Sequence, residues 1–372
     1  GAVTHCARWR TLAELRPLHC QAMVYSSERR LRQLRGVVCP SRPYAPVAAA
    51  AAAPQTTPTV KVGIFGAGGH ARRAHAPNLR TLPGVEIVAI ADANLELAKQ
   101  LADDFAPGAR CYADGHEMLA AEPELHALFS VVPAFVRAAG VEAAAAAKGI
   151  HIFSEKPQTL DMATARGIAA AIEQAGVVSS VGFRERYRPL FRAARDYLAG
   201  KEVVHVAFRS FSGVPKPKPA EVKSWHDDFL KMGGSMFDWG CHAVDYVRFM
   251  TGEDVISAQA WYNHPEQYLT PLSASVNFLL TNGATMTSTF VSATGDFDRQ
   301  PWFVIHFVGG TLALYGYERM EVSTGKGTAV EYSAAEDRNP EAPADGYVRG
   351  VGYDPWYDSG LPSEGHILAE HT

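Results

Sequence analysis

Four polar side chains in this chain have types and spacing that suit proton transfer at an alcohol. Asp238, His242 and Asp245 follow one another at intervals of four and three residues, so on one helix they would share a face. An imidazole oriented by a carboxylate can take up a hydroxyl proton as hydride leaves the carbon, and the ammonium group of Lys156 can hydrogen-bond the same hydroxyl. These residues therefore predict acid–base chemistry at a secondary alcohol.

Two other interpretations of the same residues stay open. His242 could be a histidine that belongs to the core of the protein, and Asp238, His242 and Asp245 could together bind a metal ion. We expect no metal site, because no convincing further ligands stand near these residues in the sequence. Two consecutive glycines, Gly233 and Gly234, precede the group and permit a close backbone approach, which favours a functional site.

A glycine-rich turn much earlier in the chain predicts a dinucleotide site. Gly66-x-Gly68-x-x-Ala71 directly follows the apolar run 60–65, which is typical of a buried strand. The first glycine allows a tight turn, and the second lets the backbone approach a pyrophosphate. The third small residue lets helix and strand pack closely, and the helix N-terminus favours negative charge.

Asp92 ends the next expected strand, 24 residues after Gly68. A carboxylate there can hold the ribose hydroxyls of NAD and would repel the 2′-phosphate of NADP. Its other interpretation, a helix N-cap, is compatible with that role. Arg72 and Arg73 in the first helix leave some room for NADP.

These residues need a parallel sheet to position them. Short apolar runs alternate with helical patterns up to Val181, which predicts a doubly wound α/β domain with right-handed crossovers. The strands are expected at 60–65, 85–91, 110–112, 127–132, 151–153 and 177–181, with a helix capped by Asn94, one after Pro133 and one at 160–174. Lys156 then follows the fifth strand, at the edge where open α/β sheets bind their ligands, and Pro157 biases it toward an extended backbone.

The pattern changes beyond Gly182 to that of an α+β domain with a mostly antiparallel sheet. Helices are expected at 189–198 and from Gly233 to Met250, and strands at 203–211, 255–262, 273–281, 284–291, 303–308 and 311–315. Asn282-Gly283 and Gly309-Gly310 are each typical of a two-residue hairpin turn. From about Ser333 onward the sequence has no convincing periodicity.

The 372 residues are enough for two domains, and the composition is that of a globular protein. Residues 1–58 contain eight Arg, no Lys and only Glu14 and Glu28, so they carry +6, while the remainder carries −10. An Arg-rich, acid-poor leader predicts a transit peptide, with plastid favoured over mitochondrion, or else untranslated or mispredicted sequence. Without such a leader we expect a cytoplasmic protein.

The charge and apolar content also exclude several classes of partner. The acidic body does not suit a nucleic-acid-binding protein, and no run approaches the roughly 20 apolar residues of a membrane span. Only Cys111 and Cys241 lie in the body, far apart, which argues against a disulfide framework and a zinc site.

The three blocks together resemble the glucose–fructose oxidoreductase, inositol dehydrogenase and rhizopine-catabolism family (Gfo/Idh/MocA). The resemblance runs from about Val60 to Tyr315 and includes Tyr112-Ala113-Asp114, Gly182-Phe183-Arg184 with Tyr187, and Asp-x-Gly-x-His-x-x-Asp at 238–245. It implies an N-terminal Rossmann domain, an α+β domain whose open sheet often forms an oligomer interface, and NAD(P)-linked chemistry on sugars, inositols or related alcohols. Residues 59–181 would form the first domain and 182–332 the second, with an irregular tail at 333–372.

The resemblance also implies roles for individual residues. His242 would be the acid–base group, Lys156 would polarise the hydroxyl, and Asp238 would orient the pair. The other candidates are Arg184 and Trp225, with Asp238 and His242, for the substrate, and Gly66, Gly68, Gly69, His70, Ala71, Asp92, Val132, Pro133, Glu155 and Lys156 for the cofactor.

One departure concerns the nicotinamide end of the site. Many relatives have Thr-Pro after the fourth strand and a His four residues beyond the proline, whereas this chain has Val132-Pro133 and Arg137. This departure bears on the details of the nicotinamide contact.

Two alternatives stay open beside a dehydrogenase: a catalytically silent nucleotide sensor or scaffold, and redox-neutral sugar chemistry with tightly held NAD. Lys156, Asp238 and His242 argue against the first, because a sensor has no need of them.

Overall fold

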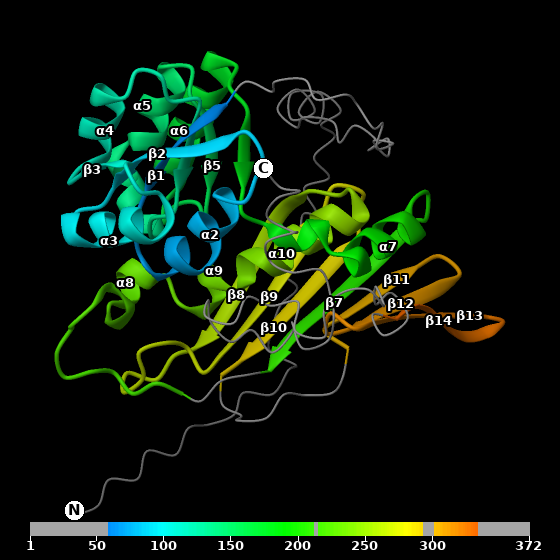
Figure 1. The fold of residues 1–372 in the computed structure, drawn as a ribbon. Helices are drawn as coiled ribbons and strands as arrows, with labels where there is room; N and C mark the ends of the chain where they lie inside the picture. The colour runs from blue at the N-terminus through cyan, green and yellow to red at the C-terminus, as the bar shows by residue number, and fades with distance from the viewer. Residues whose placement is uncertain (1–58, 212–214, 293–300, 334–372) are drawn as a thin grey trace, which may run out of the picture. The chain divides into compact units, whose positions relative to one another are not determined.

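The computed structural model describes residues 59–211, 215–292 and 301–333, all within one compact unit (Figure 1). The expected leader at 1–58 and nearly all of the expected tail lie outside the described residues. In the part of the chain that is described, no helix combines the length and apolar character needed to cross a membrane. The domain boundaries given above stay a prediction.

The first half contains the predicted doubly wound sheet. Its strands are β1 (Val60–Phe65), β2 (Val85–Ala91), β3 (Arg110–Tyr112), β4 (Ala127–Ser130), β5 (His151–Ser154) and β6 (Ser179–Val181). Their order is β3-β2-β1-β4-β5-β6 and every pair is parallel. The order reverses between β1 and β4, and a ligand of such a sheet binds beyond the carboxyl ends of the strands at this reversal.

Helical segments cover both faces of this sheet, and their apolar side chains pack with those of the strands to form two apolar cores (Figure 1). The helical segments are η2 (Ala71–His75), α2 (Ala76–Leu79), α3 (Leu95–Phe105), α4 (Gly115–Ala121), η3 (Ala134–Ala139), α5 (Val141–Ala147) and α6 (Met162–Ala175). The side chain of Asn94 accepts a hydrogen bond from the backbone N–H of Glu96, so the expected cap of α3 is confirmed. The single helix expected after Pro133 is wrong, because Gly140 adopts a φ of 79° and separates η3 from α5.

The second half builds an eight-stranded sheet in the order β14-β13-β12-β11-β7-β10-β9-β8. Its strands are β7 (Val203–Phe211), β8 (Val255–Asn263), β9 (Ser273–Leu280), β10 (Thr285–Val291), β11 (Phe303–Phe307), β12 (Gly310–Tyr315), β13 (Arg319–Thr324) and β14 (Gly327–Ser333). All pairs are antiparallel except β7 with β10, so the predicted mostly antiparallel sheet is confirmed. Hairpins form at both predicted places, with φ of 87° at Gly283 and 96° at Gly309, but the exact turns differ from the prediction. The first loop has three residues, because Leu280 pairs with Ala284. The second turn lies one residue earlier than predicted, because Gly310 already pairs with Phe307.

One face of this sheet carries the core of the second half. Helices α7 (Pro189–Leu198) and α10 (Gly240–Thr251) lie on it, and their apolar side chains pack with those of the strands (Figure 1). Along β9 the side chains alternate between buried and exposed, as expected for a sheet with one covered face. The remaining helical segments are η4 (Arg184–Tyr187), η5 (Trp225–Asp227), α8 (Phe229–Met232) and α9 (Ser235–Asp238).

The continuous helix expected from Gly233 to Met250 is wrong. Trp239 lies between α9 and α10, and its indole N–H donates to Ser210 Oγ of β7 at 3.1 Å. This contact with the sheet anchors the residue at which the two helices separate. Asp238 therefore ends one helix, whereas His242 and Asp245 belong to the next.

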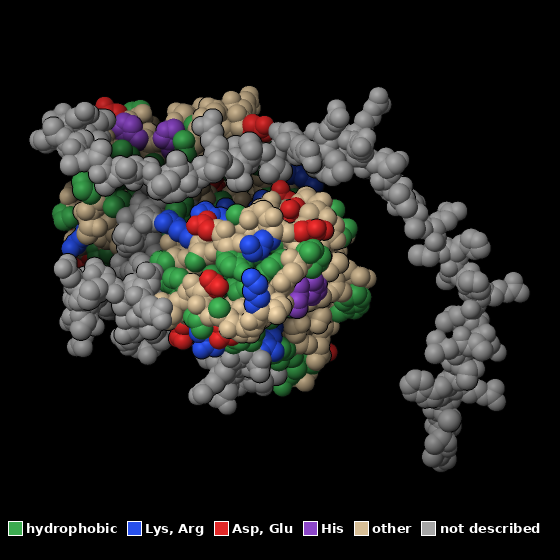
Figure 2. Space-filling model, turned by 90° about the vertical axis from the view of Figure 1, so that its right-hand side faces the viewer, with side chains coloured by type: hydrophobic (Ala, Val, Ile, Leu, Met, Phe, Trp, Pro, Cys, Tyr) green, Lys and Arg blue, Asp and Glu red, His purple; other side chains and the backbone are tan. Residues whose placement is uncertain are grey.

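Figure 2 shows the molecule from the side on which β13 and β14 lie in Figure 1. Lys and Arg side chains are interspersed with Asp and Glu on this face, without a broad basic stripe among the described residues.

Candidate active site

The glycine turn has the geometry that a bound pyrophosphate requires. Gly66 adopts a φ of 102°, and a Cβ added there would stand 2.5 Å from the carbonyl oxygen of Val131. A Cβ on Gly68 would have no atom within 4 Å, so the backbone at this residue faces open space. Ala71 is fully buried against the sheet, which confirms close packing at the third position. The residues present therefore fit a dinucleotide.

The two glycines predict different outcomes on substitution. Gly66→Ala should lower the free energy of unfolding by about 1–3 kcal/mol, because the new Cβ is incompatible with both the φ angle and the carbonyl of Val131. Gly68→Ala should leave stability within about 0.5 kcal/mol but weaken NAD binding at least about tenfold, because its Cβ fills the open space. Denaturant unfolding and calorimetric titration with NAD measure the two effects. Equal effects of both substitutions on stability would contradict this account.

Asp92 lies where a ribose-binding carboxylate is expected, directly after β2. Its Oδ2 accepts a 2.8 Å hydrogen bond from the N–H of Ala67 in the glycine turn. Its Oδ1 accepts one from the N–H of Asn94 at 2.8 Å. The carboxylate is thereby oriented beside the turn, while Asn94 and not Asp92 caps the helix.

Arg137, at the position where the family resemblance leads one to expect a histidine, is 1% exposed. Its guanidinium pairs with Glu142 Oε1 at 2.7 Å and donates to the carbonyl of Glu155 at 2.7 Å. Weaker contacts at 3.3 Å reach the carbonyls of Ser130 and Val132. Arg137 thus ties the end of β4 to the end of β5.

Lys156 and Asp238 meet although 82 residues separate them in the sequence. Lys156 Nζ donates to Asp238 Oδ1 at 2.8 Å. The lysine side chain is 24% exposed and the aspartate 58%, so the pair is accessible to a ligand. The expected meeting of the turn after β5 with the Asp238 segment is therefore present.

His242 is buried among aromatic rings. Its ring centroid lies 5.2 Å from that of Trp239, 5.7 Å from Tyr246 and 5.8 Å from Phe183. Burial, reinforced by the charge of Lys156, lowers the pKa of His242 to about 4, so the imidazole is neutral near pH 7. The Nδ1 atom is buried and has no hydrogen-bond partner among the described residues.

The expectation that a carboxylate on the same helix face orients His242 is wrong. Asp238 pairs with Lys156, and Asp245, which is 2% exposed, pairs with Arg186 at 2.9 Å. Each carboxylate is thus engaged by a cation from another element. Asp238 and Asp245 accordingly do not form a metal-ligand group with His242 among the described residues.

Arg184 and Trp225 occupy different surroundings. Arg184 is partly exposed, pairs with Glu185 at 3.2 Å, and acts electrostatically on His242. Trp225 stacks on His226 with centroids 3.7 Å apart, and its ring lies 6.1 Å from that of Phe135, two residues beyond Pro133. The loop that carries Trp225 therefore touches the segment after β4.

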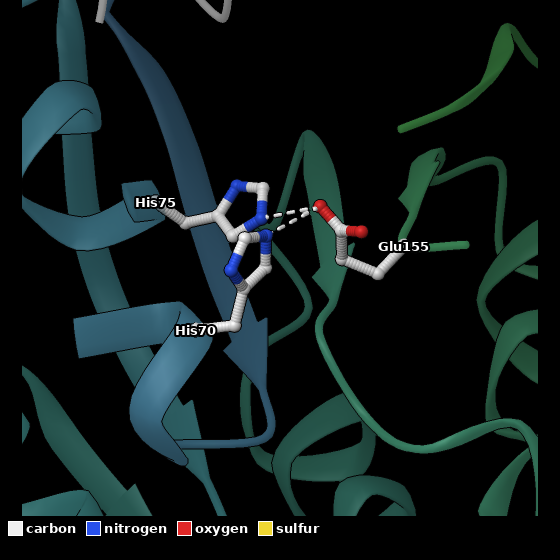
Figure 3. A group of neighbouring side chains, drawn as sticks. All are labelled: His70, His75 and Glu155. Atoms are coloured by element: carbon white, nitrogen blue, oxygen red, sulfur yellow. Dashed lines mark hydrogen bonds and ion pairs between the residues drawn. The ribbon is translucent and has the colours of Figure 1, made fainter. Parts of the chain in front are cut away.

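Glu155 contacts His70 and also His75, a residue that the sequence analysis did not single out. Glu155 is 7% exposed, and its Oε1 contacts His75 Nε2 at 2.8 Å and His70 Nε2 at 3.1 Å (Figure 3). Burial would raise the pKa of Glu155, but the hydrogen bonds from both histidines hold it well below the usual range. His75 lies 80 residues from Glu155, and no local pattern signals such a contact.

Comparison with known proteins is consistent with this arrangement. Residues 60–183 match the model of the GFO_IDH_MocA oxidoreductase family with an NAD-binding Rossmann fold, and residues 191–313 match the GFO/IDH/MocA C-terminal domain. The chain belongs to this family. It is thus an oxidoreductase with an NAD-binding domain, and the predicted resemblance, cofactor and enzyme class are confirmed.

Curated relatives and solved structures agree at low identity. The chain is 28% identical over 294 residues to the uncharacterized oxidoreductase YrbE of Bacillus subtilis, and this alignment covers 76% of each chain. It is 26% identical over 305 residues to inositol 2-dehydrogenase of Rhizobium meliloti, and this alignment covers 78% of this chain and 81% of the relative. An oxidoreductase from Agrobacterium radiobacter, solved with NAD+, L-tartaric acid and magnesium, shares the fold at 22% identity. That match has a TM-score of 0.62 and covers 83% of this chain and 85% of the other.

Proposed function

We propose that the protein is a dehydrogenase that transfers hydride between NAD and a secondary alcohol carbon of a sugar, inositol or related polyol. The meeting of Lys156 with Asp238, near the buried neutral His242, is the observation that carries this proposal. The inositol 2-dehydrogenase relative supports a polyol as the substrate class. The bacterial relatives do not support a plastid location.

The residues of the glycine turn and Asp92 would hold the cofactor. When bound, NAD supplies the hydride acceptor. The turn offers backbone N–H groups and open space at Gly68 to the pyrophosphate, and Asp92 offers its oriented carboxylate to a ribose. Both groups belong to the carboxyl edge of the parallel sheet, which also carries Lys156.

Lys156, Asp238 and His242 would bind the substrate hydroxyl and transfer its proton. Lys156 donates a hydrogen bond to the substrate oxygen and stabilises its developing negative charge, while Asp238 holds the ammonium group in place. Neutral His242 accepts the hydroxyl proton in the oxidation direction and returns it in the reduction direction. Arg184 and Trp225 would contact the rest of the substrate.

A panel of polyols and sugars tests this function. The full chain is incubated with each compound and with NAD or NADP, and reduced cofactor is followed by absorbance. We expect turnover with at least one polyol, and a preference for NAD because of Asp92. Binding of NAD without turnover on any member of the panel would favour a silent sensor instead.

A homo-oligomer through the large sheet belongs to the same proposal. The uncovered face of β8 and β9 exposes Trp261, which is 54% exposed, and Leu279, which is 38% exposed. Apolar side chains gathered on one open face are typical of a surface that another chain covers. Light scattering should show at least a dimer for the wild type and a smaller species for Trp261→Glu. A monomeric wild type would contradict this prediction.

A further inference from the structure

His70, His75 and Glu155 converge from two separate elements. His75 is the last residue of η2, His70 is the N-cap of the same segment, and Glu155 follows β5 (Figure 3). The two imidazole Nε2 atoms and one carboxylate oxygen lie within 4.8 Å of one another. The proposed hydride transfer assigns no proton or hydride step to these three side chains, although the family resemblance places His70 and Glu155 among the cofactor candidates.

The arrangement satisfies hydrogen bonding as it stands, and it also approaches the geometry of a zinc site. Zinc binds nitrogen and oxygen at about 2.0–2.2 Å, so the ligand atoms of a tetrahedral site lie about 3.3–3.5 Å apart. The separation of 2.8 Å from Glu155 Oε1 to His75 Nε2 would need to widen by about 0.5–0.7 Å, and that of 3.1 Å to His70 Nε2 by about 0.2–0.4 Å. Two imidazoles and one carboxylate are also a ligand set that leaves a fourth position open on zinc.

Contacts around the three side chains orient them. Glu155 Oε2 accepts a hydrogen bond from the N–H of Lys156 at 3.1 Å, which fixes the carboxylate. The ring of His75 is packed 5.2 Å from that of Phe153 and 6.0 Å from that of Phe129. His70, by contrast, has a side chain that is 44% exposed. His75 and Glu155 already form a buried hydrogen bond with each other. His70 therefore adds a third possible metal-ligand atom, on the solvent side.

We propose that His70, His75 and Glu155 bind one Zn²⁺ ion, with the fourth position open on the exposed side of His70. The ion links the helix after the glycine turn to the turn after β5. The proposed hydride transfer draws on Lys156 and His242, and metal binding is measured without turnover, so the two proposals can fail separately.

Cobalt substitution and metal stoichiometry test the site. The full chain is stripped with a chelator and dialysed against Zn²⁺, or titrated with Co²⁺ as a spectroscopic probe of nitrogen and oxygen ligation. His70→Ala is compared with the wild type and with His116→Ala, which removes another exposed histidine of the same domain. We expect His70→Ala alone to lose one equivalent of Zn²⁺ and the visible Co²⁺ bands. Equal stoichiometry and spectra in all three proteins would overturn the proposal.

Thermal unfolding provides a second measurement that does not depend on activity. An ion that binds the folded state alone raises its stability by mass action. Zn²⁺ in excess should raise Tm by at least about 3 °C in the wild type and in His116→Ala, but not in His70→Ala. His70 is half-exposed, so its replacement should leave the metal-free Tm nearly unchanged. The same Zn²⁺ shift in His70→Ala would contradict the site.

Discussion

His242→Ala is expected to lower kcat for alcohol oxidation by about 10³-fold while NAD binds with unchanged affinity. The reason is that the buried imidazole is the acid–base group, and positioned groups of this kind contribute about 10²–10⁴-fold. Steady-state kinetics and calorimetric titration with NAD measure the two effects. His116→Ala, an exposed histidine on α4, is the matched control and should retain full activity. Loss of less than tenfold in His242→Ala would contradict the assigned role.

The pH profile gives an independent measure of the same group. Because burial lowers the pKa of His242 to about 4, the neutral base persists down to about pH 4, and kcat/KM for oxidation should fall only below that value. The lowered pKa also means that the unfolded state binds this proton more readily. Because of His242, the free energy of unfolding should therefore decrease as pH falls from about 6.5 to about 4. His242→Ala should remove that dependence on pH. An acidic limb near pH 6.5 would indicate a solvated histidine.

Arg137→Ala should produce the largest loss of stability of any single substitution considered. The Arg137 and Glu142 side chains are both 0% exposed and pair at 2.7 Å. Removing the guanidinium leaves the Glu142 carboxylate buried without its cation, which typically costs about 3–5 kcal/mol. It also leaves the carbonyl of Glu155 without its donor. Denaturant unfolding measures the change in free energy.

Two companion variants separate charge burial from packing. Arg137→Met with Glu142→Gln removes both charges at similar volume and should recover at least half of the loss. Arg195→Ala breaks a half-exposed pair with Asp196 and should cost less than about 1 kcal/mol. Arg137→Ala with a cost no larger than that of Arg195→Ala would show that the buried pair is not structurally important.

Local patterns were sufficient where neighbouring residues determine the structure. The glycine turn with Asp92 was predictable because strand, turn and helix are consecutive, and each glycine has a separate steric reason. The Asn282-Gly283 hairpin was predictable because positive φ is needed at that turn. Strands β13 and β14 escaped prediction, since β14 is largely exposed and lacks the alternation of a half-buried strand.

Contacts between distant residues could not be predicted in the same way. The break between α9 and α10 depends on the indole of Trp239 reaching Ser210 of β7. The replacement of a histidine by Arg137 gave no hint that the guanidinium would be buried and paired with Glu142. His75 has no distinctive neighbours in sequence, and only the fold brings it to Glu155.

Isotope transfer tests the central claim most directly. A polyol panel deuterated at the carbinol carbons is incubated with NAD and the full chain, and the nicotinamide ring is analysed by mass spectrometry. We expect deuterium in the reduced cofactor for the wild type and none above background for a Lys156→Ala, His242→Ala double variant. Absence of deuterium from the wild-type cofactor, in a sample shown by calorimetry to bind NAD, would contradict hydride transfer from a polyol.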